Sequence, residues 1–75
     1  MVGGIVWDTE HPGEPMAGAL VTLRETGGRV LTREDGGFFF TGVPLGKVTL
    51  TVRAAGREER SFEAFAPSLG VQVEI

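Results

Sequence analysis

Hydrophobic and polar residues alternate along this chain in short runs that favour β-strands over helices. The clearest run is Lys47–Ala54, where valine, leucine and alanine at even positions alternate with lysine, threonine and arginine at odd positions. Such alternation is typical of a strand with one buried and one solvent-exposed face, as in antiparallel sheets. No window shows a sustained 3.6-residue apolar period, and the only stretch compatible with a helix, Arg57–Phe65, has no convincing cap.

Turn signals divide the chain into seven predicted strands. Glycine and proline fall between the apolar segments, as in Asp35-Gly36-Gly37 and Thr26-Gly27-Gly28. The predicted strands are Val2–Asp8, Ala19–Glu25, Arg29–Thr32, Phe38–Phe40, Lys47–Ala54, Glu58–Phe65 and Val71–Ile75, with Ala66–Gly70 as the last loop. The sixth strand is charged, which suits the edge of a sheet. We therefore expect an all-β fold, a seven-stranded antiparallel β-sandwich that forms a single domain over residues 1–75.

The alternation also predicts which apolar residues form the core. In the aromatic strand, Phe38 and Phe40 point inward and Phe39 points outward. The complete predicted core is Val2, Val6, Ala19, Val21, Leu23, Leu31, Phe38, Phe40, Val48, Leu50, Val52, Phe62, Val71, Val73 and Ile75.

Four apolar residues are left on the outside by the same reasoning. They are Ile5, Trp7, Leu20 and Phe39, and they include the only tryptophan. A single exposed apolar residue is ordinary, but several together often mark a contact with another molecule. These four residues are the candidate contact surface, and the alternative is that the loop Thr9–Met16 folds over them.

Composition narrows the classes of partner. The chain has 75 residues, no cysteine and a net charge of −3, so it has no disulfide, and nucleic acid or an anionic membrane is not expected as a partner. No apolar run reaches the length of a membrane span. The first residues lack the basic and apolar regions of a signal peptide, which leaves the compartment open.

No set of side chains in the sequence predicts catalysis, a cofactor or a metal ion. The only histidine, His11, lies in a loop with no nucleophile and orienting partner beside it, and we interpret it as solvated. Ser61 and Ser68 have no adjacent base. The acidic residues that could bind calcium match no calcium-loop spacing and are better explained by turns; they are Asp8, Glu10, Glu34 and Asp35. We expect Asp35 to cap the turn before Gly36.

An ordered series of motifs resembles the carboxypeptidase regulatory-like domain. The series is Gly4-x-Val6-x-Asp8, Pro15-Met16-Ala17-Gly18-Ala19-x-Val21-Thr22-Leu23, Thr32-x-x-Asp35-Gly36-x-Phe38-x-Phe40, Gly42-Val43-Pro44-x-Gly46-x-x-Thr49-Leu50 and Ala54-x-Gly56. The resemblance covers nearly the whole chain. It implies an Ig-like, transthyretin-like sandwich without an active site, a module that accompanies peptidases, outer-membrane receptors and other secreted or envelope proteins and aids folding, spacing or contact with partners.

The chain departs from the family pattern at three positions. Arg33 stands where the family often has an acidic residue, and Val48 and Arg57 stand where it often has aromatics. Contacts that the family builds with those aromatics must therefore differ here. Related adhesin modules form a Lys–Asn isopeptide bond, which is excluded because the chain has no asparagine; Lys47, its only lysine, is expected to be solvated.

Three classes of function follow from these observations. The first is a non-enzymatic β-sandwich module that contacts another protein or another copy of itself through the outward apolar residues. The second is carbohydrate binding, with Trp7 and Phe39 stacking on sugar rings. Against it, sugar sites also use amides, and the chain has only one, that of Gln72. The third, a small hydrolase, lacks any nucleophile–base pair.

Overall fold

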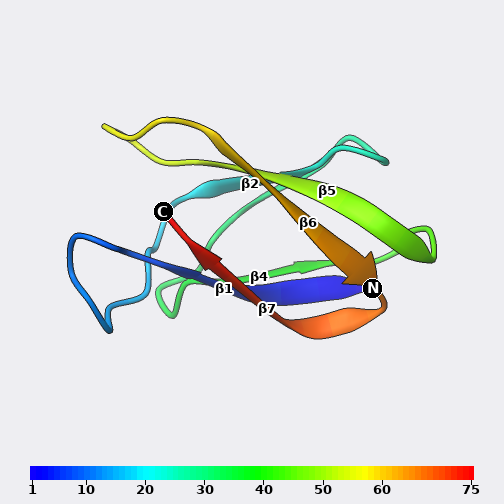
Figure 1. The fold of residues 1–75 in the computed structure, drawn as a ribbon, viewed down its shortest axis with the longest axis horizontal. Coiled ribbons are helices and arrows are strands. Elements are labelled where there is room, and N and C mark those ends of the chain that lie inside the picture. Colours follow the sequence, from blue (N-terminus) through cyan, green and yellow to red (C-terminus); the bar gives the residue numbers. More distant parts are fainter.

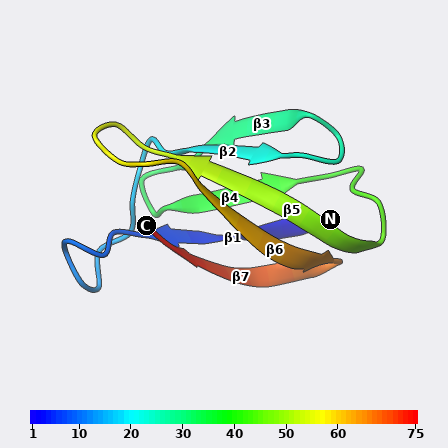
Figure 2. The same cartoon turned by 45° about the horizontal axis from the view of Figure 1, so that its top comes forward.

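Seven strands form two sheets that stack as the layers of a sandwich (Figure 1). The computed structural model describes all residues 1–75, and its strands are β1 (Val2–Trp7), β2 (Leu20–Leu23), β3 (Gly28–Leu31), β4 (Gly37–Phe40), β5 (Gly46–Arg53), β6 (Arg60–Ala66) and β7 (Ser68–Glu74). One sheet has the order β4-β1-β7 and the other β3-β2-β5-β6 (Figure 2). No helix is long and apolar enough to cross a membrane. The all-β sandwich predicted from the sequence is confirmed.

The pairing of the strands differs from the prediction in one place. β1 and β7 run parallel, whereas every other pair is antiparallel. β6 belongs to the four-stranded sheet and β7 to the three-stranded one, so the chain changes sheets between them at the cis Ala66–Pro67 bond. Alternation within a strand indicates its two faces but not its direction relative to a neighbour, so a parallel pair could not be seen in the sequence. The charged β6 does lie at the edge of its sheet, as expected.

The core lies between the two sheets and largely matches the predicted set. Phe38 and Phe40 are buried, while Phe39 is 42% exposed, so the predicted faces of β4 are confirmed. Leu31 was predicted to be buried and is 65% exposed. It lies directly opposite Leu20 in the antiparallel β2–β3 pair, and opposite residues share a face. Three residues complete the core without having been predicted: Val43, Ala64 and Ala66.

Gly4 allows β7 to approach β1 closely. A Cβ at Gly4 would lie 2.0 Å from the carbonyl oxygen of Val71 and 2.8 Å from its Cβ. The register of this pair shifts between Val2 and Gly4, because Val2 pairs with Ser68 and Gly4 with Val71. Such a bulge bends a strand and redirects its side chains. With this bulge, β7 begins at Ser68, which is three positions earlier than predicted and lies inside the segment expected to be the last loop.

Candidate functional site

Three of the four predicted contact residues share one face of the molecule. Ile5 and Trp7 on β1 and Phe39 on β4 project from the outer face of the three-stranded sheet, where Gly3 pairs with Phe39. Leu20 does not belong with them, because it lies in β2 and faces outward from the other sheet. Alternation distinguishes inside from outside, but it does not say which of two sheets a strand joins. The predicted four-residue contact surface therefore keeps only Ile5, Trp7 and Phe39.

Leu69 lies on this face instead of Leu20. It lies at the bulge of β7 and is 62% exposed. A Cβ at Gly3 would lie 3.0 Å from Cδ1 of Phe39 and 3.5 Å from Cδ2 of Leu69, so both side chains lean over this glycine from neighbouring strands. We call Ile5, Trp7, Phe39 and Leu69 the outer apolar face. The sequence could not reveal Leu69, because its segment was interpreted as a loop.

A hollow of about 400 Å³ opens beside Phe39 and Leu69 on this face. Gly3 and Gly37 are among its lining residues, and the space exists partly because neither has a side chain. Arg33 and Asp35 form its polar margin, with Arg33 Nε 3.6 Å from Asp35 Oδ1. Apolar walls with one charged margin suit the insertion of an apolar side chain.

Asp35 holds the turn that leads into β4. The backbone N–H of Gly37 donates to Asp35 Oδ1 at 2.8 Å, so the predicted turn cap is confirmed, with Gly37 as the donor. This hydrogen bond, together with Arg33, lowers the pKa of the Asp35 carboxyl below its usual value of 3.8. The arginine that departs from the family pattern therefore supports the turn at the margin of the hollow.

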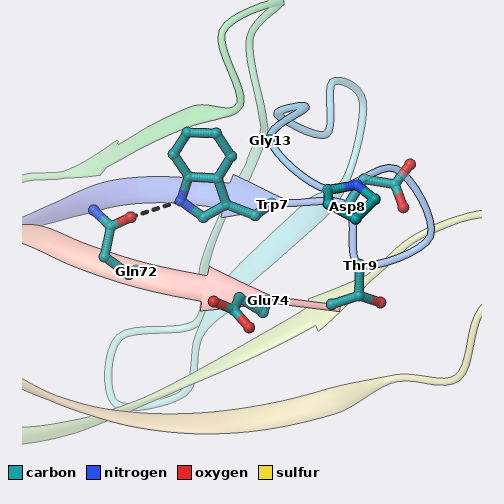
Figure 3. Close-up of a pocket in the computed structure, with 7 residues that line it drawn as sticks. Trp7, Asp8, Thr9, Gly13, Gln72 and Glu74 are labelled. Atoms are coloured by element: carbon teal, nitrogen blue, oxygen red, sulfur yellow. Dashed lines mark hydrogen bonds between the residues drawn. The ribbon is translucent and has the colours of Figure 1, made fainter.

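Trp7 is half-buried at the other end of the outer apolar face (Figure 3). Its indole Nε1 donates to Oε1 of Gln72 on β7 at 2.6 Å. The loop Thr9–Met16 does not fold over the outer apolar face as a whole. Its last residues continue the pairing of β1 instead, with Met16 N donating to Val6 O at 2.8 Å and Pro15 bridging to Trp7.

A second hollow, of about 560 Å³, lies in front of Trp7. It is bounded by the strand ends and by the tip of the loop, and Figure 3 shows Gln72 and Glu74 beside the indole. Its lining residues are Trp7, Asp8, Thr9, Pro12, Gly13, Gln72 and Glu74. The outer face of the three-stranded sheet thus carries two hollows of different chemistry, and Gln72 lines both.

Arg57 ties the strand ends together behind this hollow. Its guanidinium donates to the Ile75 carbonyl at 2.8 Å and to Asp8 Oδ1 at 2.8 Å, and it lies 2.6 Å from Glu10 Oε2. The Arg57 and Asp8 side chains are only 17% and 14% exposed. Arg57 therefore joins the β5–β6 turn to the ends of β1 and β7. The sequence marked it only as a departure from the family, and its partners could not be inferred.

Two pKa shifts follow from this cluster. Burial alone would raise the pKa of the Asp8 carboxyl, but hydrogen bonds from Arg57, His11 and the Glu10 backbone outweigh it and lower the pKa from 3.8 to about 2. His11 Nδ1 lies 2.9 Å from Asp8 Oδ2, and this hydrogen bond raises the pKa of His11 above 6.5. His11 is 63% exposed, so it is largely solvated as expected, but it also belongs to the cluster.

The chemistry of the cluster is that of a structural connection. The carboxylate of Asp8 is occupied by hydrogen bonds and by the Arg57 charge. Nowhere does the structure bring together three or more His, Asp or Glu side chains that could hold a metal ion. Glu34 and Asp35 lie in the β3–β4 turn, whereas Asp8 and Glu10 follow β1.

Comparison with known proteins places the chain in a family. No curated protein matches it. The family model of the carboxypeptidase regulatory-like domain matches residues 1–75, so this chain belongs to that family of non-catalytic regulatory β-sandwich modules.

Proposed function

We propose that this chain is an interaction module whose outer apolar face packs against the same face of a second copy. The proposal rests on one observation: two exposed side chains, Phe39 and Leu69, lie directly beside a hollow of about 400 Å³. A surface with both a protrusion and a recess can be complementary to itself.

Two-fold symmetry makes that complementarity useful. In a symmetric dimer, a residue of one copy that fills a site on the second copy is matched by the reciprocal contact. Phe39 of each copy would enter the hollow floored by Gly3 and Gly37 of the other. Each square ångström of apolar area removed from water contributes roughly 25 cal/mol, so covering these exposed side chains favours association.

The margin of the hollow adds a polar component to the contact. Arg33 and Asp35 lie there with opposite charges, and both side chains are about two-thirds exposed, at 68% and 70%. Across a two-fold axis, Arg33 of one copy would approach Asp35 of the other. Exposed pairs of this kind add little affinity but help to set the orientation of the two partners.

Sedimentation velocity at rising protein concentration tests this proposal. The concentration should reach about 1 mM, because an interface built on so few exposed side chains is expected to be weak. We expect the average mass of the native chain to rise with concentration and that of Phe39→Thr/Leu69→Thr to stay at the monomer value. The matched control, Leu31→Thr/Phe65→Thr, removes two apolar residues that are at least as exposed from the other sheet and should behave like the native chain.

Two results would refute self-association through this face. One is a native chain that stays monomeric over the whole range. The other is a control variant that loses association as fully as the double variant of the outer apolar face.

A further inference from the structure

The hollow in front of Trp7 has a composition unlike that of the hollow beside Phe39. Apart from Trp7 and Pro12, its lining residues are polar or glycine. The hollow beside Phe39 has four large apolar side chains, and its polar lining residues are Arg33, Asp35 and Gln72. A single aromatic surface surrounded by polar groups does not suit a purely apolar ligand, which would leave those groups unpaired. The volume of about 560 Å³ is in the range of small-molecule sites.

The parallel β1–β7 pair places two polar side chains beside Trp7. Gln72 pairs with Ile5 and Glu74 with Trp7, so both side chains project from the same face of the sheet as the indole. Gln72 accepts the Trp7 N–H through Oε1, which fixes the indole and leaves the amide NH₂ as a free donor. Figure 3 shows the Gln72 amide joined to the indole by this hydrogen bond, with Glu74 farther along β7.

The carboxylate of Glu74 is available to a ligand. None of the salt bridges of the chain involves it, in contrast to Asp8, which is occupied by Arg57 and His11. A carboxylate accepts hydrogen bonds from hydroxyl groups, and the Gln72 NH₂ donates to them. Thr9, whose hydroxyl donates to the Ile75 carbonyl, offers a further acceptor at the edge of the hollow.

These groups match the chemistry of a neutral sugar. One face of a pyranose ring is apolar and stacks on an aromatic ring, while its hydroxyls need both donors and acceptors around the edge. The only amide side chain and the only tryptophan of the chain, 65 positions apart in the sequence, meet at this site. The Gln72 amide, whose place in the fold the sequence did not indicate, therefore lies next to the aromatic surface.

We propose that the hollow formed by Trp7, Gln72, Glu74 and Thr9 is a binding site for a neutral sugar of one or two pyranose rings. Trp7 belongs to the outer apolar face, so a bound sugar and a second copy would compete for it, although self-association centres on Phe39 and Leu69. Because the site is open and its aromatic surface is single, the expected Kd is of the order of 1 mM. Acidic sugars are disfavoured, since Glu74 and the net charge of −3 repel them.

Tryptophan fluorescence provides a direct test, because Trp7 is the only tryptophan and the chain has no tyrosine. The probes are maltose, cellobiose, lactose and diacetylchitobiose, with glucuronate and tetramethylammonium for comparison, each up to about 50 mM. We expect at least one neutral disaccharide to give a saturable change in emission, with glucuronate at least threefold weaker. Amide chemical shifts in β1 and β7 should change with the same Kd.

Variants separate this site from the rest of the sheet face. Gln72→Ala and Glu74→Ala should each weaken binding of that disaccharide about tenfold, the equivalent of roughly 1.4 kcal/mol. Phe39→Thr, on the same sheet face but outside the hollow, should bind like the native chain, and so should Glu59→Ala, an exposed carboxylate at the β5–β6 connection. Loss of binding in Phe39→Thr would show that the ligand sits elsewhere.

Three results would overturn the sugar site. The first is no change in emission or shifts with any of the disaccharides. The second is saturable binding of tetramethylammonium without sugar binding, which would identify a site for cations on the Trp7 face. The third is sugar binding that Gln72→Ala and Glu74→Ala leave unchanged.

Discussion

The outer faces of the two sheets expose similar numbers of large apolar side chains but arrange them differently. Leu31 and Phe65 on the four-stranded sheet are 65% and 66% exposed, compared with 42% and 62% for Phe39 and Leu69 on the three-stranded sheet. β3 and β6, which carry Leu31 and Phe65, are the two opposite edges of their sheet, with β2 and β5 between them. Phe39 and Leu69 instead meet over Gly3.

The residues between the apolar side chains explain the difference. The outward residues of β5 are Lys47, Thr49, Thr51 and Arg53, and Lys47 forms an ion pair with Glu63 on β6. The four-stranded sheet therefore presents a polar surface between Phe65 at one edge and the neighbouring Leu20 and Leu31 near the other. In the three-stranded sheet, the central strand β1 has Gly3 between Phe39 and Leu69. Because Gly3 has no side chain, those two side chains can approach each other. Exposure of single residues says less about contact than their adjacency does.

The largest expected effect is a difference in stability between substitutions on the inner and the outer face of β4. Phe38→Ala or Phe40→Ala should lower the free energy of unfolding by about 3–5 kcal/mol, since each removes a buried ring from the core. Phe39→Ala should cost less than about 1 kcal/mol in the monomer, because its ring lies on the outer face. Urea denaturation followed by circular dichroism measures all three. Similar losses at the three positions would contradict the assignment of faces.

The second effect concerns the cluster that joins the two sheets near Trp7. Arg57→Leu removes the hydrogen bonds to Asp8 and to the Ile75 carbonyl, and we expect the melting temperature to fall by roughly 5 °C. The emission of Trp7 should change as well, because the cluster borders its hollow. The control is Arg53→Leu, an exposed arginine on the outer face of β5. If both variants lose the same stability, Arg57 has no special role in joining the sheets.

The third effect is a dependence of stability on pH that comes from one end of the sandwich. The pKa of Asp8 is about 2 in the folded state and 3.8 as its ordinary value, so its contribution is present above pH 4 and is lost as the pH falls towards 2. The raised pKa of His11 has the opposite sign: its contribution is complete below pH 6.5 and is lost as the pH rises through the folded-state pKa.

Urea midpoints measured between pH 2 and 8 would test both signs. Asp8→Asn should flatten the alkaline end of the profile, because it removes the carboxylate that perturbs His11. It should also reduce the slope at the acid end, where the lowered pKa of Asp35 leaves part of the dependence in place. Glu63→Gln, which breaks only the exposed pair with Lys47 on the other sheet, should leave the profile nearly unchanged. A native profile that Asp8→Asn does not alter would rule out this cluster as its source.

The smallest effect compares Leu69 with Leu31 directly. Each is about two-thirds exposed, so Leu69→Thr and Leu31→Thr should change monomer stability by no more than about 0.5 kcal/mol. Self-association makes the melting temperature depend on concentration. We expect that dependence to disappear in Leu69→Thr and to persist in Leu31→Thr. Calorimetry at several concentrations distinguishes them, and identical curves would remove the distinction between the two faces.

The sequence by itself determined the fold class, the positions of the strands and most of the core. These features depend on local alternation and on turn residues, which are visible within a few positions of the chain. The two faces of β4 and the placing of β6 at an edge are examples. The prediction was wrong where a strand was short, as at Leu31 in β3, because four residues leave its register free to shift by one position.

Only the tertiary structure decided which of the outward residues meet. Membership of a sheet separated Leu20 from Ile5, Trp7 and Phe39, and the bulge beside Gly4 brought Leu69 to them. The parallel pairing of β1 with β7 set Gln72 and Glu74 beside Trp7 on the neighbouring strand, and the β5–β6 turn brought Arg57 to Asp8. These contacts join residues 49 to 67 positions apart, and they depend on strand order and direction, which local alternation does not specify.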